Sequence, residues 1–246
     1  MKDHRTLKTI LAMGVLLLVF FLQGAVVAIG DLDGIASAVV RGAIIWGLAL
    51  ITTVFYLMRH KRLDFLGFAK PRRGAFKRLY YFVPPIAVAL AGLSFGVDAD
   101  IGFGMLFANL FLTLGIGFCE ELYFRGIICG LWMGSGARVA VAVSSALFAL
   151  CHLMNIAGGA GAVETVLQVC FALVYGVVFA LIFISSRSIW PCVALHAFHD
   201  FCSFVGADGA ASANAAVGAV QFAILLCYIF VLVRKNRFAD YPAEEA

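Results

Sequence analysis

The chain has 246 residues, of which 63% are apolar and only 13% are charged. An average soluble domain is about half apolar and about a quarter charged, so this composition excludes a soluble globule, a disordered chain and a collagen-like fibre. The net charge of +4 is mild and gives no indication of a nucleic-acid partner.

Apolar runs long enough to span a bilayer, which takes roughly 20 residues, follow one another along the chain. In chain order they are 9–28, 35–58, 79–97, 101–119, 139–156, 166–184, 189–205 and 217–233. After the fourth run, apolar character resumes at 127–133, which we interpret as a helix extension or a short interfacial segment. Pro84-Pro85 should kink or break the third run, because two backbone hydrogen bonds are lost there.

These runs predict an all-α fold, a polytopic membrane helix bundle of about eight transmembrane helices. The first run is too long for the apolar part of a cleavable signal, so we expect it to remain as an anchor. We find no internal repeat and no second domain, and therefore expect residues 1–246 to form a single membrane domain.

Positive charges are distributed unevenly between the loops. If the N-terminus is cytoplasmic, 16 of the 18 Lys and Arg residues fall on the cytoplasmic side, as the positive-inside rule requires. The segment 59–78 carries the largest group, interleaved with Leu and Phe, which is typical of a membrane-surface segment. The two remaining residues, Arg41 and Arg125, lie inside spans or at their ends. We expect a multi-pass protein of the cell membrane with both termini in the cytoplasm.

The cysteines lie within apolar runs, and their number, seven, is odd. No CxxC spacing occurs, so neither a disulfide framework nor a zinc ribbon is indicated. We interpret these residues as small buried hydrophobic side chains.

Ionisable residues at membrane depth cluster in three segments of successive spans. Such groups are costly in lipid, so each requires a partner or a function. The segments are Glu120-Glu121-x-x-x-Arg125, Phe148-x-x-x-His152 and His196-x-x-His199-Asp200. They contain carboxylates and imidazoles but no lysine, which indicates acid–base chemistry more than chance placement.

The two glutamates are expected to differ in environment. Glu121 and Arg125 are four residues apart and share one helical face, which favours an ion pair. Glu120 lies about 100° around the helix from Glu121, so it is not committed to this ion pair and is free for a catalytic role. Two carboxylates with different proton affinities are what acid–base catalysis uses.

Each histidine segment also has a purely structural interpretation. His152 alone would fit a buried neutral ring bonded to a backbone carbonyl. His196 and Asp200 alone would fit a helix-stabilising pair near a membrane end, whereas in a functional site Asp200 would hold the His196 ring in one tautomer. Taken together, the segments favour a shared polar pocket formed by residues 120, 152, 196 and 200.

In this pattern the chain resembles the CPBP family of intramembrane proteases, which includes the CAAX prenyl endopeptidases and the bacteriocin-processing (Abi) enzymes. The family pattern is EExxxR, then FxxxH, then HxxxN or HxxxD on successive helices. All three motifs are complete and in order here, and the resemblance extends over a catalytic core at about 79–205.

The resemblance implies roles for the motif residues. Glu120 and His152 would activate the attacking water, and His196 and Asp200 would stabilise the oxyanion, with Glu121 assisting. Some relatives have Asn at this position, and its N–H could donate to the oxyanion directly. Asp200 cannot donate a hydrogen bond unless protonated, so here it would instead orient and charge His196 or bind a metal. The remaining residues are interpreted as support for the site: Arg125, Phe148 and His199.

Metal dependence is open at this point. Glu120, His152 and His196 are of the types that ligate zinc, so Zn²⁺ is a candidate cofactor. No HExxH motif is present to provide the usual zincin geometry. We favour a glutamate-activated water without a metal over a metalloprotease.

The function expected from these residues is an intramembrane endopeptidase that hydrolyses a membrane-associated peptide or protein substrate within the lipid bilayer. A proton-coupled transporter is one alternative, since buried Glu, His and Asp also build proton relays. A catalytically silent membrane binding or immunity protein is the other.

Overall fold

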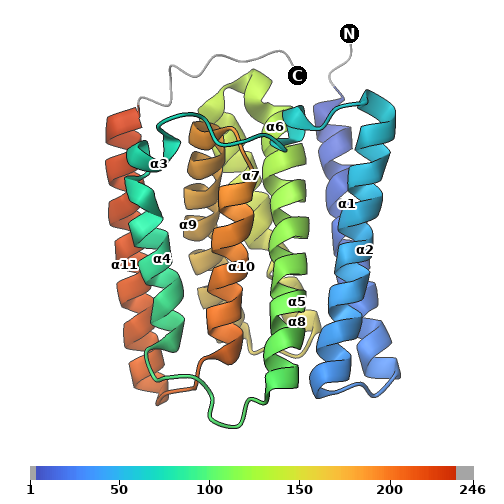
Figure 1. Cartoon of the computed structure of the whole chain (residues 1–246), viewed down its shortest axis with the longest axis vertical. Helices are drawn as coiled ribbons and strands as arrows, with labels where there is room; N and C mark the ends of the chain where they lie inside the picture. The colour runs from blue at the N-terminus through green and yellow to red at the C-terminus, as the bar shows by residue number, and fades with distance from the viewer. Residues whose placement is uncertain (1–3, 237–246) are drawn as a thin grey trace.

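The computed structural model describes residues 4–236, and it is a bundle of helices (Figure 1). In this part of the chain the only β-type pairing is an isolated antiparallel bridge between Val97 and Gly206. The long helices are α1 (Arg5–Ile29), α2 (Gly34–His60), α5 (Phe103–Glu121), α7 (Ala137–Cys151), α9 (Ala162–Ser186), α10 (Trp190–Val205) and α11 (Ala211–Asn236). The shorter elements are η1 (Asp64–Leu66), α3 (Ala75–Arg78), η2 (Tyr80–Phe82), α4 (Val83–Leu90), η3 (Ala91–Leu93), η4 (Leu122–Cys129), α6 (Gly130–Trp132), η5 (Met133–Ser135) and α8 (Met154–Ala157).

Within the described residues, six helices are long and apolar enough to cross a membrane. They are Arg5–Ile29, Gly34–His60, Phe103–Ser135, Ala137–Ala157, Ala162–Ser186 and Ala211–Arg234. The predicted all-α polytopic bundle is thus confirmed. The two predicted runs at 79–97 and 189–205 form shorter helices that nevertheless run alongside the long ones (Figure 1).

Local backbone geometry explains why the run at 79–97 forms a shorter helix. Tyr80, Tyr81 and Phe82 have φ values of 52°, 54° and 59°, a left-handed conformation that stops a helix from passing through them. Pro84 and its neighbour occupy the first turn of α4, so they begin a helix where the missing N–H groups cost little. Helix α10 has 16 residues, roughly 24 Å at 1.5 Å per residue, which is less than the hydrocarbon thickness of about 30 Å.

Residues 127–133 form a helix extension, which is one of the two interpretations that the sequence allowed. Helix α5 continues without a break through η4, α6 and η5, so that Phe103–Ser135 forms one helical segment of 33 residues.

Successive helices alternate in direction, and both ends of the described chain lie at the same end of the bundle (Figure 1). At that end, Arg5 Nη1 donates to Ser135 Oγ at 2.5 Å, and Arg72 N donates to Ser186 O at 2.8 Å. At the opposite end Asp98 N donates to Val205 O at 2.9 Å. The basic segment 59–78 therefore shares an end with the N-terminal helix start, as the charge distribution predicts.

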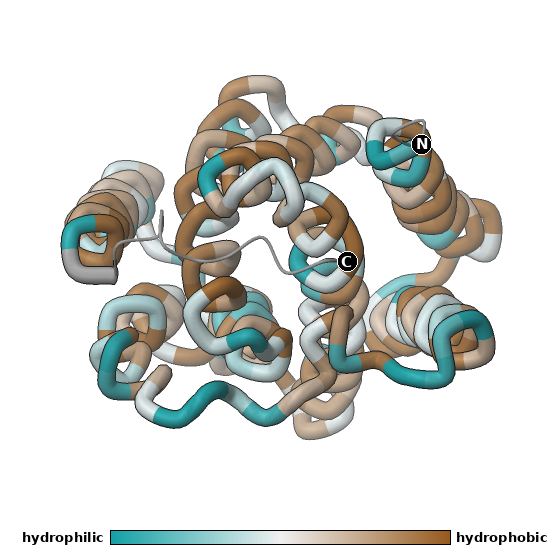
Figure 2. The backbone as a smooth tube through the Cα atoms, turned by 90° about the horizontal axis from the view of Figure 1, so that it is seen from above, coloured by the Kyte–Doolittle hydropathy of each residue, from teal (hydrophilic) through white to brown (hydrophobic). Residues whose placement is uncertain are grey.

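Viewed along the helices, apolar residues dominate the helical segments and hydrophilic residues gather mainly in the connections (Figure 2). The buried core centres on the second half of α9, on η4 and on α10, while α1, α2 and α11 expose many large apolar side chains. The cysteines are all free thiols. Four are buried, but Cys151 is half-buried and Cys170 and Cys227 are exposed, so the expectation of burial is wrong for those three, which lie nearer the bundle surface.

Helices α5 and α10 approach each other closely at a glycine. A Cβ added to Gly117 would lie 2.9 Å from Ala197 N and 3.2 Å from Val193 O, which are backbone atoms that cannot easily move. Small residues allow such close approach between membrane helices. The contact places the glutamates that follow Gly117 directly beside α10.

We expect Gly117→Ala to destabilise the folded protein by about 1–3 kcal/mol, because the extra methyl group overpacks this contact. Thermal unfolding of the detergent-solubilised protein measures the effect. Gly24→Ala in α1 is the matched control, since an added Cβ there meets no atom within 4 Å, and it should not lower the unfolding temperature. Equal unfolding temperatures for Gly117→Ala and the parent protein would contradict the close approach.

Candidate active site

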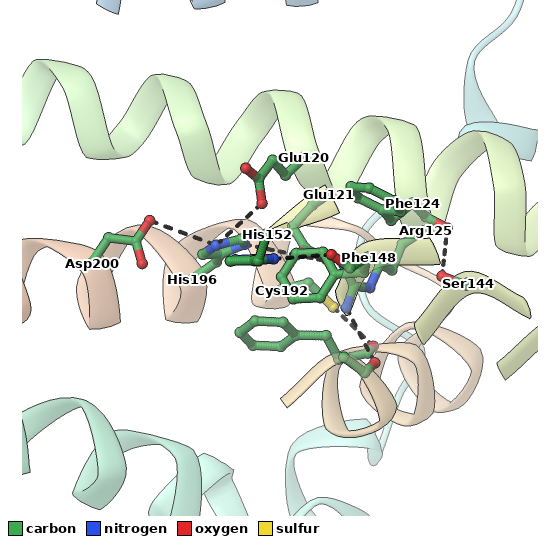
Figure 3. A network of polar contacts seen from close by, with 12 residues as sticks. Glu120, Glu121, Phe124, Arg125, Ser144, Phe148, His152, Cys192, His196 and Asp200 are labelled. Carbon is green, nitrogen blue, oxygen red and sulfur yellow. Dashed lines mark hydrogen bonds and ion pairs between the residues drawn. The ribbon is translucent and has the colours of Figure 1, made fainter. Parts of the chain in front are cut away.

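The sequence-predicted site residues come together where α5, η4, α7 and α10 meet in the bundle interior (Figure 3). Helix α5 supplies Glu120 and Glu121, α10 supplies His196 and Asp200, and His152 follows the last residue of α7. The site is therefore built from side chains that are up to 80 residues apart in the sequence and depends on helix packing.

An ion pair lies at the back of the site. The side chains of Glu121 and Arg125 are 0% exposed, and Arg125 Nη1 donates to Glu121 Oε1 at 3.0 Å. A second guanidinium nitrogen, Nη2, donates to Gly176 O at 3.1 Å. The guanidinium carbon also lies 4.5 Å from the centre of the Phe148 ring and 5.3 Å from that of Phe179. The predicted pair is present, and aromatic faces replace the solvent that would otherwise surround the cation.

The helix widens where this pair forms. Residues 122–129 adopt a π-helix, with i→i+5 hydrogen bonds, directly after Glu121. Single π-helical turns within α-helices are frequent at functional sites. Ser144 Oγ, from α7, donates to Phe124 O in this segment at 2.8 Å, so a neighbouring helix satisfies one of its carbonyl groups.

His196 is held by Glu121. The distance from His196 Nδ1 to Glu121 Oε1 is 2.8 Å, and because a carboxylate only accepts, Nδ1–H is the donor. Nε2 then faces the two other carboxylates, 3.8 Å from Glu120 Oε2 and 3.6 Å from Asp200 Oδ2. Glu121, which the close packing at Gly117 brings to Nδ1, is therefore the carboxylate that fixes the tautomer of this ring, while Asp200 lies beside Nε2.

One ring nitrogen of His152 makes the backbone hydrogen bond that the structural interpretation predicts, and the other is available for the functional role. Its Nδ1 lies 3.0 Å from Phe148 O, and since a carbonyl only accepts, Nδ1–H donates. The lone pair on Nε2 remains available. The Phe148 ring contacts both histidines, with its centre 5.1 Å from that of His152 and 5.7 Å from that of His196.

A cavity of about 250 Å³ joins the polar groups. Glu120, His152, His196 and Asp200 all line it, so these four side chains share one pocket as predicted. The exposed fractions of the Glu120 and Asp200 side chains are 14% and 22%, whereas His196 is at 6%. Glu120 and Asp200 thus present carboxylates to the cavity, while Glu121 lies fully buried behind them.

His199 is a neighbour of the site, but it faces away from the cavity. Its ring packs against Tyr175 and Phe171 of α9, with ring centres 4.8 Å and 5.7 Å apart. It is not among the described residues that line the cavity. Supporting packing is therefore the role that the structure gives it.

Sequence reasoning missed several residues of the cavity wall. Asn155 Nδ2 donates to Gln168 Oε1 at 2.6 Å, and both side chains line the cavity. They are polar residues in apolar runs and would have been found if neutral polar side chains had been considered with the ionisable ones. Leu16 and Phe20 of α1 also line the cavity, but nothing in the sequence distinguishes them from the other apolar residues of that helix.

The described residues do not by themselves form a recognisable metal site. Among the described residues, no group of three or more His, Cys, Asp or Glu side chains is placed so that it could hold one. We therefore derive no catalytic step through a metal.

Comparison with known proteins bears on this site. Residues 102–202 match the family described as type II CAAX prenyl endopeptidase Rce1-like. The matched segment contains all three motifs and confirms the resemblance to the CPBP intramembrane proteases. Among curated proteins, none matches the chain. The match, together with the apolar helices, indicates a multi-pass membrane protein related to proteases that act on membrane-associated substrates.

We expect Arg125→Met to destabilise the fold by roughly 3–5 kcal/mol, because it leaves the Glu121 carboxylate buried without its cation. The double variant Glu121→Gln with Arg125→Met removes both charges and should recover part of this loss. The yield of monodisperse protein in detergent and its thermal unfolding measure both effects. If the single variant is as stable as the parent, the ion pair does not hold this part of the bundle together.

Proposed function

We propose that the protein is an intramembrane endopeptidase that hydrolyses a peptide bond in a membrane-associated peptide or protein. The observation that carries this proposal is the shared cavity of Glu120, His152, His196 and Asp200, set against a fully buried Glu121–Arg125 pair. Peptide hydrolysis requires an activated water and a group that stabilises the oxyanion, and these side chains supply candidates for both.

In this proposal, Glu120 and His152 activate the water. A general base must lie within hydrogen-bond reach of the proton it removes, and the Glu120 carboxylate faces the cavity without sharing in the ion pair behind it. A water between this carboxylate and His152 Nε2 would lose a proton to Glu120 as its oxygen attacks the substrate carbonyl carbon. The same proton then passes from Glu120 to the leaving amine when the tetrahedral intermediate collapses.

His196 stabilises the oxyanion, and Asp200 supports it. The bond from Nδ1–H to Glu121 fixes the ring, so that Nε2 is directed into the cavity. When Nε2 carries a proton, it donates to the oxyanion, and Asp200 at 3.6 Å supports the positive charge on the ring. Glu121 and Arg125 act as positioning residues, because they reach the reacting atoms only through His196.

We further propose that both termini face the cytoplasm and that the protein resides in the cell membrane. The basic segment 59–78 and the beginning of α1 lie at the same end of the bundle. This clustering of positive charge supports a cytoplasmic location for that end.

Glu120→Gln and His152→Ala are expected to abolish cleavage while the protein still inserts and accumulates, since neither removes the buried ion pair. The test compares new N- and C-termini in membrane proteomes of cells that carry the parent protein or Glu120→Gln. Termini that disappear in the variant identify the activity and its substrates. Unchanged termini together with an unchanged cellular phenotype would instead indicate a silent binding protein, and Glu120-dependent ion flux in proteoliposomes a transporter.

Metal removal provides a separate prediction. Because Glu120, His152 and His196 are not arranged as a metal site, we expect cleavage by the purified protein to survive treatment with 1,10-phenanthroline. The assay follows a substrate found by the proteome comparison. Loss of activity that added Zn²⁺ restores would overturn the glutamate-type mechanism in favour of a metalloprotease.

A further inference from the structure

Two amide side chains form a pair on the wall of the active-site cavity, and the proposed mechanism uses neither of them. Asn155 of α8 donates from Nδ2 to Gln168 Oε1 of α9 at 2.6 Å. Both residues are exposed, and both line the cavity together with Glu120 and His152. Polar side chains in a membrane helix are costly unless they are paired or functional, so the pair requires an explanation.

The hydrogen bond between the two amides uses only part of their capacity. A side-chain amide carries two N–H donors and a carbonyl oxygen that can accept two hydrogen bonds. The remaining groups are the Nε2 donors of Gln168 and the Oδ1 acceptor of Asn155. Neither has a hydrogen-bond partner in the part of the chain that the structure describes. The pair therefore offers a donor and an acceptor side by side on the cavity wall.

A peptide bond presents the complementary groups, a C=O acceptor and an N–H donor. Such groups are almost always paired when they are buried, because leaving one unmade costs free energy. Several residues that line the cavity cannot supply a hydrogen bond from their side chains, and they include Leu16, Phe20 and Phe204. A substrate backbone that enters this cavity needs partners, and the amide pair supplies one of each kind.

The pair lies close to the candidate catalytic groups. Asn155 N donates to His152 O at 3.0 Å, so one turn of backbone joins the two residues. Side chains three residues apart on such a turn are about 5–6 Å apart at Cβ, and an extended peptide advances about 3.3–3.6 Å per residue. A substrate with its scissile carbonyl at Glu120 and His152 thus reaches the pair with a residue about one or two positions away.

We propose that Asn155 and Gln168 form a backbone clamp for the substrate. Gln168 Nε2 donates to a substrate carbonyl, and Asn155 Oδ1 accepts from a substrate N–H next to the scissile bond. The inference rests on the proposed peptidase function and adds to it what the cavity recognises, which is the main chain of the substrate. Because main-chain groups are the same in every peptide, the clamp provides binding that does not depend on side-chain sequence.

The test measures peptide binding to Glu120→Gln in phosphatidylcholine nanodiscs. The probes share one sequence with a cysteine followed by three aliphatic residues, and are made with and without a farnesyl group on the cysteine. Ester analogues of each probe replace one backbone N–H at a time by oxygen. We expect one ester in each series to bind roughly tenfold more weakly than the all-amide peptide, because Asn155 Oδ1 then loses its donor. Adding Asn155→Leu to Glu120→Gln should remove this difference.

Cleavage kinetics in the parent background provide a second measurement. Gln168→Met, which has a side chain of similar length, and Asn155→Leu should each raise KM roughly tenfold while kcat changes little, because the lost hydrogen bond contributes equally to ground-state and transition-state binding. Gln221→Leu is the matched control. It removes a glutamine that donates from α11 to Val88 O of α4 at 2.8 Å and does not line the cavity, so KM should stay unchanged.

The outcomes separate this proposal from the proposed function. An ester difference that persists after Asn155→Leu overturns the clamp, and the peptidase proposal stands if the parent protein cleaves the peptides. An Asn155-dependent difference without any cleavage supports the clamp, and only the peptidase proposal fails. Lower unfolding temperatures with unchanged affinity overturn the clamp in favour of a packing contact between α8 and α9. Failure of both probes to bind also overturns it, because the groups that it recognises are present in every peptide.

Discussion

The buried pair of Glu121 and Arg125 is the interaction on which the arrangement of the site depends. Neither side chain reaches solvent, and a charge left alone in such surroundings would cost several kcal/mol. Each partner also binds a second helix: Arg125 reaches the Gly176 carbonyl of α9, and Glu121 reaches His196 of α10. The pair therefore links three helices, and it sets which nitrogen of His196 is turned toward the cavity.

Two carboxylates that are adjacent in the sequence acquire different roles through this linkage. Glu121 is occupied by Arg125 and His196, while Glu120 faces the cavity 3.8 Å from His196 Nε2. The close contact at Gly117 makes this possible, because only a residue without a side chain lets α5 approach the α10 backbone so closely. The close packing at a small residue and the placement of the two carboxylates thus both depend on the contact between α5 and α10.

Much of this could be predicted from the sequence, because lipid imposes simple rules. Hydropathy and the positions of lysine and arginine predicted the helical bundle and the end at which its basic segment lies. The ionisable residues at membrane depth predicted the four side chains of the cavity. Both the third and the seventh run were predicted, but not that their helices are short. The positive φ at Tyr80 and the 16-residue length of α10 cannot be recognised in an apolar run. The contact of Glu121 with His196 was also missed, because it follows from the approach of two helices and not from spacing along either one.

Helix α1 provides part of the cavity wall through Leu16 and Phe20, while much of its remaining surface is exposed and apolar. A molecule dissolved in the bilayer meets that surface by diffusion in two dimensions. Its encounter rate is then governed by its surface density on the membrane, and not by its amount per unit volume of cell water. Any change in lipid area or in partitioning of the substrate would alter turnover without touching a single residue of the protein.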